Sequence, residues 1–230
     1  MSATVVNMDA GSFRFWQTTV GKKAIMAVTG FILFGFVVGH LLGNLQVFES
    51  PEKLNHYAAL LKSLAGLLWT ARIVLLVSVA LHIWSSFELW LLQREARPIK
   101  YVKKANIAST YASRTMMWSG PIILVFVIWH LLQFTFGAVH PGAPFSDVNV
   151  YNNVVLGFQV WPVSLFYIIA MTMLCYHLYH GLWSMFQTLG FNHPVYTPWL
   201  KTIAKIVAIV IAIGYISIPV AVLAGFIKPV

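Results

Sequence analysis

Four histidines inside long apolar segments are the residues of this chain best placed to do chemistry. His40, His82, His130 and His177 each stand in a different apolar run. An imidazole is costly to place in a hydrocarbon core, so it is kept there for a ligand, an ion or a proton. A single such histidine is also explained by a hydrogen bond to a neighbouring helix. Four on successive segments can be tested against one another.

The composition is that of a membrane protein. The chain has 230 residues, of which 59% are hydrophobic and 9% charged, whereas a soluble domain carries about 25% charged residues. Cys175 is the single cysteine, which excludes a disulfide framework and an iron–sulfur cluster of the chain's own, since such a cluster needs about four thiolates. Residues 1–16 are polar and mixed, so we expect no cleavable signal peptide.

Five apolar stretches are long enough to cross a bilayer, which takes about 20 residues. The sequence therefore predicts an all-α integral membrane protein forming a single membrane domain over residues 1–230. The expected spans are residues 22–47, 65–92, 116–138, 159–189 and 200–227.

The connections between these stretches differ in character. After the polar residues 49–53, residues 54–63 fit a short interfacial helix. Residues 93–114 form the longest polar piece. Residues 139–155 are predicted to be a loop, because they contain two prolines and a glycine close together. In the last span, Pro219 is expected to kink a helix that serves only for packing.

The basic residues predict the orientation of the chain in the membrane. With five spans, 11 of the 15 Lys and Arg residues fall on one side, and the positive-inside rule places that side, with the N-terminus, in the cytoplasm. The 11 residues are Arg14, Lys22, Lys23, Arg94, Arg97, Lys100, Lys103, Lys104, Arg114, Lys201 and Lys205.

The four histidines form two pairs by depth. At 1.5 Å per residue, His40 and His130 lie about 25 and 24 Å from the predicted cytoplasmic ends of their segments. His82 and His177 lie about 18 and 20 Å from theirs. The pattern thus indicates an outer pair, His40 with His130, and an inner pair, His82 with His177.

Two opposed imidazoles at one depth in an apolar bundle are suited to hold a b-type haem through both axial positions. The sequence therefore predicts two haems b enclosed by the first four spans. A zinc site would need about four ligands together, commonly with cysteine or carboxylate. A proton-coupled transporter, the alternative from another class of protein, would need carboxylates in the spans, and Glu88 lies at a cytoplasmic end.

A weak internal repeat supports two equivalent halves. Thr29-Gly30 precedes His40 and Ser119-Gly120 precedes His130, both in the pattern [ST]-G-x9-H. His82 and His177 are each followed four residues later by a small residue, Ser86 and Gly181 respectively. Small residues allow a backbone or a flat ligand to approach closely.

His180 is a second candidate on the fourth span. It lies three residues after His177, on a neighbouring helix face, and could replace that residue as ligand or hydrogen-bond a haem propionate. We favour His177, because its depth matches that of His82 better. His56, His140 and His193 fall in connections, where we expect solvated surface histidines.

The run His177-x-x-x-Gly-Leu-Trp-Ser, together with Trp129-His130 and Gly39-His40-Leu41, resembles the cytochrome b membrane-anchor subunit of bacterial succinate dehydrogenases and fumarate reductases. The similarity is to the single-polypeptide, five-helix, dihaem type and extends from about Gly21 to Phe226. It implies that His40 and His130 ligate a distal haem, while His82 and His177 ligate a proximal one. In the family the fourth-helix ligand precedes Gly-Leu-Trp-Ser by four residues, which also favours His177.

The resemblance implies the rest of the complex. A flavoprotein with FAD would interconvert succinate and fumarate, and an iron–sulfur subunit would exchange electrons with this chain, which passes them to or from a quinone, usually menaquinone. Those partners would lie on the cytoplasmic side of the bacterial inner membrane, where the basic 93–114 loop could dock them or attract anionic lipid. No nucleic-acid partner is expected, and oligomerisation of the complex stays open.

Two details of the resemblance concern protons and quinone. Some dihaem fumarate reductases have a glutamate two residues before the fourth-helix ligand, where this chain has Cys175, so the associated proton pathway is not carried over. The family's quinone site uses an acid of the first outer connection, and Glu49, Glu52 and the nearby His56 are the candidates. The cytochrome b subunit of a hydrogenase or formate dehydrogenase is an alternative that fits the histidine spacing less well.

Overall fold

The computed structural model describes residues 14–97, 99 and 109–230. All regular elements within this part of the chain are helices, and five of them are long and apolar enough to cross a membrane, as predicted. These five are α1 (Thr19–Asn44), α3 (Ala65–Glu95), α4 (Tyr111–Phe134), α6 (Trp161–Thr188) and α7 (Thr197–Leu223). The shorter elements are α2 (Pro51–Ser63), α5 (Val150–Gln159) and the 3-10 turns η1 (Phe15–Gln17) and η2 (Leu45–Phe48).

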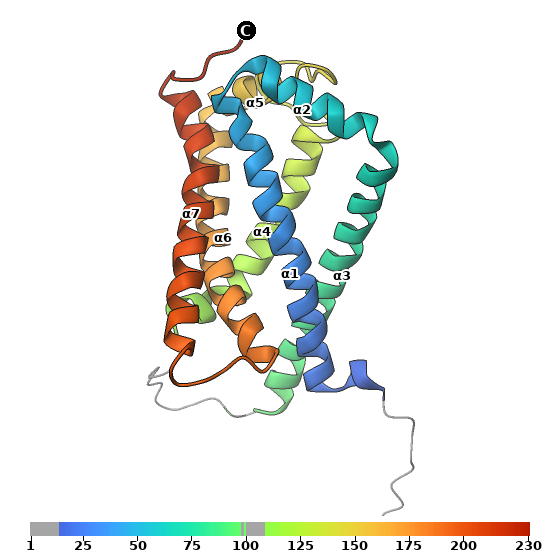
Figure 1. The fold of residues 1–230 in the computed structure, drawn as a ribbon, viewed down its shortest axis with the longest axis vertical. Coiled ribbons are helices and arrows are strands. Elements are labelled where there is room, and N and C mark those ends of the chain that lie inside the picture. The colour runs from blue at the N-terminus through green and yellow to red at the C-terminus, as the bar shows by residue number, and fades with distance from the viewer. Residues whose placement is uncertain (1–13, 98, 100–108) are drawn as a thin grey trace, which may run out of the picture.

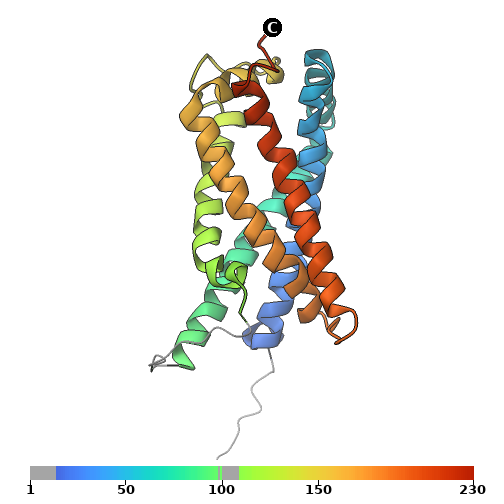
Figure 2. The ribbon, with the colours of Figure 1, turned by 90° about the vertical axis from the view of Figure 1, so that its left-hand side faces the viewer.

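The five long helices lie side by side, and the two short helices cover one end of the bundle (Figure 1). We call this end, which also holds the C-terminus, the cap end. The opposite end, where α1 begins and α3 finishes, is called the basic end. Figure 2, turned by 90°, shows the same arrangement, with α7 running along α6.

The order of packing leaves two diagonal helix pairs apart. α1 packs along α3 and α6, while α6 also packs along α4 and α7. The diagonal pairs, α1 with α4 and α3 with α6, make no extended backbone contact. Side chains therefore have to bridge the space across each diagonal.

Small residues on α7 allow it to lie close to α6 and α1. Ala204 and Ala208 are buried against Leu178 and Leu182 of α6. Because lipid tails are as apolar as the side chains, the hydrophobic effect does not drive membrane helices together, and close van der Waals packing is a main source of their association. These contacts between α6 and α7 agree with the prediction that the last span serves for packing. The helix continues through Pro219 to Leu223.

The cap end corrects one prediction. Residues 139–155 were expected to be a loop, but α5 begins at Val150, where the Asn149 side chain accepts a hydrogen bond from the Asn152 backbone N–H. The helix-breaking prolines and glycine are confined to residues 141–144, and the residues from 150 onward have apolar positions at helical spacing. These positions are buried in the cap core: Tyr151, Val154, Val155 and Phe158. The predicted interfacial helix at 54–63 is present and begins earlier, at Pro51.

The third span was predicted four to five residues too late, at 116–138 rather than Tyr111–Phe134. The side chain of Thr110 caps the start by accepting a hydrogen bond from the Ser113 backbone N–H. At the other end Gly137 adopts a positive φ of 62°, and the Ala138 N–H returns to the carbonyl of Leu132. Apolar residues after Phe134 thus belong to the turn, where hydropathy alone would extend the helix.

The helix surfaces are suited to lipid. Only 6% of the most apolar stretch of α3 is buried, so its apolar side chains face outward. Exposed tryptophans stand near helix ends, with Trp69 and Trp161 at the cap end and Trp199 at the basic end. Indole rings favour the membrane–water interface, so these residues mark its two levels. The chain is a multi-pass membrane protein.

Gly142 offers a test of the cap. Its φ is 102°, and a Cβ atom there would lie 2.6 Å from the backbone oxygen of Leu156 in α5. Gly142→Ala should therefore reduce the free energy of unfolding by about 1–3 kcal/mol, measured by thermal denaturation in detergent. Gly35→Ala, in α1 with open space around it, is the control and should be neutral or stabilising. Equal destabilisation by both changes would contradict this account of the cap.

Candidate functional site

The structure brings the four intramembrane histidines together as two pairs, each across one diagonal of the bundle. His40 of α1 and His130 of α4 have ring centroids 5.6 Å apart, and their planes are nearly perpendicular at 86°. His82 of α3 and His177 of α6 have centroids 6.3 Å apart, with an interplanar angle of 54°. These are the outer and inner pairs that the sequence predicts.

The separation of the rings fits a shared metal ion. An imidazole nitrogen binds a first-row transition metal at about 2 Å, so two rings on opposite sides of one ion have centroids about 6 Å apart. Both pairs are close to this value. Among the described residues, no group of three or more His, Cys, Asp or Glu side chains converges on a metal position. The donor set is therefore two nitrogens per site, as bis-histidine haem ligation requires.

The levels of the two pairs differ by more than the sequence depths indicated. Thr29 contacts His82 and lies eleven residues before His40 on α1, so the pairs are separated by about 16 Å along the helix axis. The sequence depths gave about 6 Å. That value was wrong because α3 extends beyond α1 at the basic end: Lys22 lies level with Glu88, about two turns before the end of α3.

Three of the four histidines have a hydroxyl group at Nδ1. The Thr29 Oγ1 lies 3.2 Å from His82 Nδ1, the Ser119 Oγ 3.3 Å from His177 Nδ1, and the Tyr167 hydroxyl 3.3 Å from His130 Nδ1. Within the described residues, His40 has no such hydrogen bond and instead stacks on Phe36, with centroids 5.2 Å apart.

The proton of each hydroxyl is committed elsewhere. Thr29 donates to the backbone oxygen of Ile25 at 2.7 Å, and Ser119 donates to that of Met116 at 3.4 Å. Tyr167 donates to Gln133 Oε1 at 3.0 Å. When a hydroxyl donates its proton in this way, its oxygen accepts from the histidine Nδ1–H, and the histidine Nε2 keeps a free lone pair. This is the tautomer that a metal-ligating histidine needs.

The internal repeat is longer than the sequence pattern suggested. Phe126 stacks on His130 just as Phe36 stacks on His40, four residues before it in each case. The repeat therefore reads [ST]-G-x5-F-x3-H in α1 and α4. Eleven residues are close to three helical turns, so the hydroxyl and the histidine lie on one helix face at two levels. Gly30 belongs to this arrangement, because a Cβ there would be 3.3 Å from His82 Cε1.

Comparison with protein families identifies the chain. The family described as "Succinate dehydrogenase/Fumarate reductase transmembrane subunit" matches residues 91–216, more than half of the 230 residues. The chain belongs to this family. No curated protein and no solved structure gave a significant match. The match agrees with the resemblance found in the sequence and favours it over the alternative, a hydrogenase or formate dehydrogenase subunit.

The matched region of this succinate dehydrogenase/fumarate reductase subunit contains one member of each pair, His130 and His177. His40 and His82, which precede it, face these two residues in the structure. The geometry thus connects the part of the chain that matches the family with the part before it.

His180 and Trp183 form a separate buried group beside the inner pair. Their rings are 5.4 Å apart, and neither His180 Nδ1 nor Trp183 Nε1 has a hydrogen-bond partner among the described residues. Lys201 of α7 places its ammonium 4.6 Å from the centre of the Trp183 ring. Buried polar atoms are normally paired, so these two nitrogens suit an acceptor that a ligand brings.

A part-buried ion pair near the basic end, with Lys22 buried and the Glu88 side chain 35% exposed, could not be predicted from the sequence. Lys22 Nζ of α1 lies 2.7 Å from Glu88 Oε2 of α3, and the Lys22 side chain is 9% exposed. The two residues are 66 positions apart, so only the side-by-side packing of α1 and α3 could reveal the contact. A charge this deep needs a partner, which Glu88 supplies.

The three quinone candidates stay separate on the cap end. Glu49 and Lys53 form an exposed ion pair of 3.5 Å, and Glu52 and His56 are exposed on α2. The pKa of Glu52 is lowered by a hydrogen bond from its own backbone and one from the Ser50 side chain. Glu52 is therefore ionised at neutral pH and can accept a proton but not donate one.

The remaining connection histidines behave differently from one another. His56 and His193 are exposed as predicted, but the prediction for His140 was wrong. It is half-buried, with Nδ1 2.8 Å from the Ala143 oxygen and Nε2 3.1 Å from the Asn153 oxygen. It ties the turn before α5 to that helix. Within the predicted 93–114 loop, residues 93–95 belong to α3 and 111–114 to α4, while 98 and 100–108, with Lys100, Lys103 and Lys104, lie outside the described residues.

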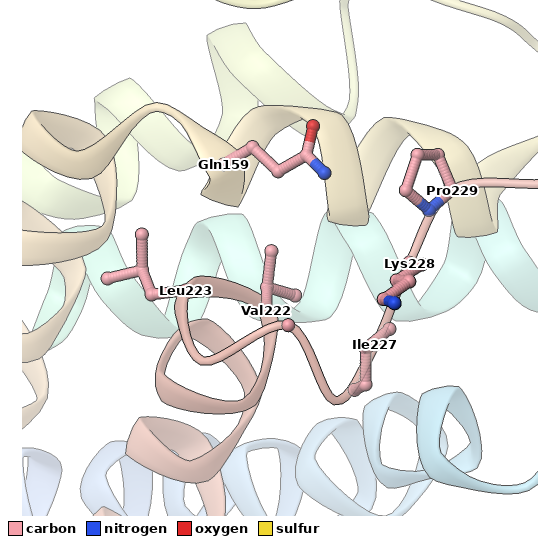
Figure 3. Close-up of a pocket in the computed structure, with 7 residues that line it drawn as sticks. Gln159, Val222, Leu223, Ile227, Lys228 and Pro229 are labelled. Carbon is pink, nitrogen blue, oxygen red and sulfur yellow. The ribbon is translucent and has the colours of Figure 1, made fainter.

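An open surface pocket at the cap end holds none of the paired histidines. It lies where α5 ends and α7 gives way to the C-terminal segment (Figure 3). Its lining is mainly apolar, with Gln159 and Lys228 as the side chains that can hydrogen-bond. The chemistry-bearing residues lie between the helices instead.

The Lys22–Glu88 contact can be tested by a double-mutant cycle. Glu88→Gln leaves the Lys22 ammonium buried without its counter-charge and should lower the free energy of unfolding by about 1–3 kcal/mol. Adding Lys22→Met should recover part of that loss. In the exposed pair, Glu49→Gln should change stability by less than about 1 kcal/mol. Stability is measured by thermal denaturation, and equal losses of stability in Glu88→Gln and Glu49→Gln would contradict the contribution of the Lys22–Glu88 contact.

Proposed function

We propose that this subunit is the dihaem cytochrome b of a succinate:quinone oxidoreductase. It anchors the complex in the membrane and relays electrons between an iron–sulfur subunit and a membrane quinone, with menaquinone as the expected quinone. The observation that carries the proposal is the two histidine pairs, whose ring separations of 5.6 and 6.3 Å suit one iron each. The succinate chemistry and the FAD belong to the partner flavoprotein.

The chain's own residues would hold the two haems b by their axial positions. His40 and His130 would ligate the distal haem, near the cap end, and His82 and His177 the proximal haem. A bis-histidine haem supplies one-electron transfer without binding a further ligand. In the outer pair, Phe36 stacks on His40 and Phe126 on His130, which places apolar rings beside the proposed distal haem.

The donors around His180 fit the carboxylates of the proximal haem. Trp183 Nε1 is a buried donor without a partner, His180 Nδ1 is a buried nitrogen without a partner that donates in its protonated tautomer, and Lys201 adds a positive charge nearby. These contacts favour a propionate rather than the iron as the partner of His180. His177, whose ring faces His82, would hold the iron.

The basic residues support an order of the two haem sites between the iron–sulfur subunit and the quinone. The described basic residues gather mainly at the basic end, which by the positive-inside rule faces the cytoplasm of a bacterial inner membrane. The proximal pair is nearer that end, where the iron–sulfur subunit would dock. The distal pair is nearer the cap end, where Glu52 is an ionised acid close to the expected quinone position.

Haem content tests the proposal directly. The purified protein should show a reduced b-type absorption spectrum with about two haems per chain. His82→Ala or His177→Ala should each remove the same haem and leave the other, because a single imidazole cannot fill both axial positions. His40→Ala and His130→Ala should remove the second haem instead.

His180→Ala separates an iron ligand from a propionate partner, since it removes another imidazole from the same helix. It should leave two haems bound. A colourless wild-type preparation would refute the proposal, and loss of a haem in His180→Ala with retention in His177→Ala would reverse the ligand assignment. Succinate:quinone activity of the whole complex then tests the relay itself.

A further inference from the structure

We infer that Thr29, Ser119 and Tyr167 are positioning residues that fix the tautomer of three haem ligands and raise their basicity. The inference rests on the proposed function, because it concerns ligands to haem. It adds three residues that lie outside the ligand set and whose hydroxyls face Nδ1 of His82, His177 and His130.

Toward the histidines, these three hydroxyl oxygens accept a hydrogen bond rather than donate one. The Thr29 proton is given to the Ile25 carbonyl at 2.7 Å, a shorter contact than the 3.2 Å to His82. Ser119 has a carbonyl acceptor as well, that of Met116 at 3.4 Å, a distance similar to the 3.3 Å to His177. We infer the same arrangement for Ser119 from its equivalent place in the repeat. An oxygen whose one proton is used up can only accept, so the imidazole N–H must point toward it.

Tyr167 reaches the same result through an amide. Gln133 is fully buried, and its Oε1 accepts from Trp129 Nε1 at 2.9 Å and from the Tyr167 hydroxyl at 3.0 Å. An indole N–H can only donate, which fixes the amide with its oxygen toward Trp129 and Tyr167. The Tyr167 proton is thereby held, and the phenol oxygen accepts from His130 Nδ1.

The second step concerns which helix supplies each hydroxyl. Thr29 and Ser119 belong to α1 and α4, the helices that carry the distal ligands three turns further on. Each half of the bundle thus uses one helix face for two tasks, a ligand at one level and a positioning hydroxyl at the other. This gives a reason for the [ST]-G-x9-H spacing that ligation alone does not provide.

The third step is an asymmetry between the sites. Both proximal ligands have an acceptor at Nδ1, but of the distal ligands only His130 has one among the described residues. A hydrogen bond from Nδ1–H increases imidazolate character and stabilises the oxidised metal. The positioning hydroxyls therefore act on both proximal ligands but on one distal ligand.

Removal of each hydroxyl gives the test, with redox potential and the low-temperature electron paramagnetic resonance (EPR) spectrum of the purified complex as readouts. Thr29→Val and Ser119→Ala should each shift the proximal haem to a more positive potential and alter its EPR signal, leaving the distal haem unchanged. Tyr167→Phe should do the same to the distal haem alone. Affinity for the affected haem should fall by about 10–100-fold.

The controls separate positioning from a general packing effect. Thr172→Val and Ser217→Ala remove hydroxyls that are bonded to a carbonyl of their own helix, and should move neither haem signal. Thr29→Ser and Ser119→Thr keep the hydroxyl and should retain the wild-type potential. If Thr29→Val does not fold, the smaller change Ser119→Ala tests the same haem.

The outcomes distinguish the inference from the proposed function. Two bound haems whose potentials and EPR signals are unchanged in Ser119→Ala and Tyr167→Phe would overturn the positioning role and leave the haem assignment intact. A wild-type protein without haem would overturn the proposed function itself.

Discussion

The structure depends on one constraint: both nitrogens of an imidazole in a hydrocarbon core need a hydrogen-bond partner or a metal, because no water is available there. In three of the four intramembrane histidines, one nitrogen is satisfied by a hydroxyl from a neighbouring helix. That leaves the other nitrogen as a buried lone pair directed into the bundle. Such nitrogens, two in the inner pair and one in the outer pair, are costly without a ligand and favourable with one. The packing order sets α1 across from α4 and α3 across from α6 without extended contact.

The same constraint explains the two-level arrangement. A membrane helix that must supply a ligand at one level and an acceptor at another can do so from one face only if the two residues are separated by whole turns. The eleven-residue interval in α1 and α4 meets this condition. α3 and α6 supply the inner ligands, His82 and His177, whose Nδ1–H groups donate to these acceptors. Half the bundle thus repeats the design of the other half, and α7 packs outside it against α6.

Much of this could be predicted from the sequence, because hydropathy and histidine spacing are local signals. Five spans, the pairing of His40 with His130 and His82 with His177, and the helix at the start of the cap all follow from residues close in the chain. Contacts between distant residues could not be predicted. Lys22 with Glu88, and Tyr167 with Gln133 and His130, depend on which helices are neighbours. The depth estimate failed for a related reason, since helix ends need not be level. Thr29 and Ser119 were visible as a repeat, but their role required knowing what they face.

The central claim is that each histidine pair holds one haem iron. Anomalous X-ray scattering at the iron absorption edge, on crystals of the purified complex, tests it most directly. The account predicts two iron peaks within this chain, one between His40 and His130 and the other between His82 and His177, separated by about 16 Å along the helix axes. Absence of iron from the bundle, or an iron beside His180 with His177 unligated, would contradict it.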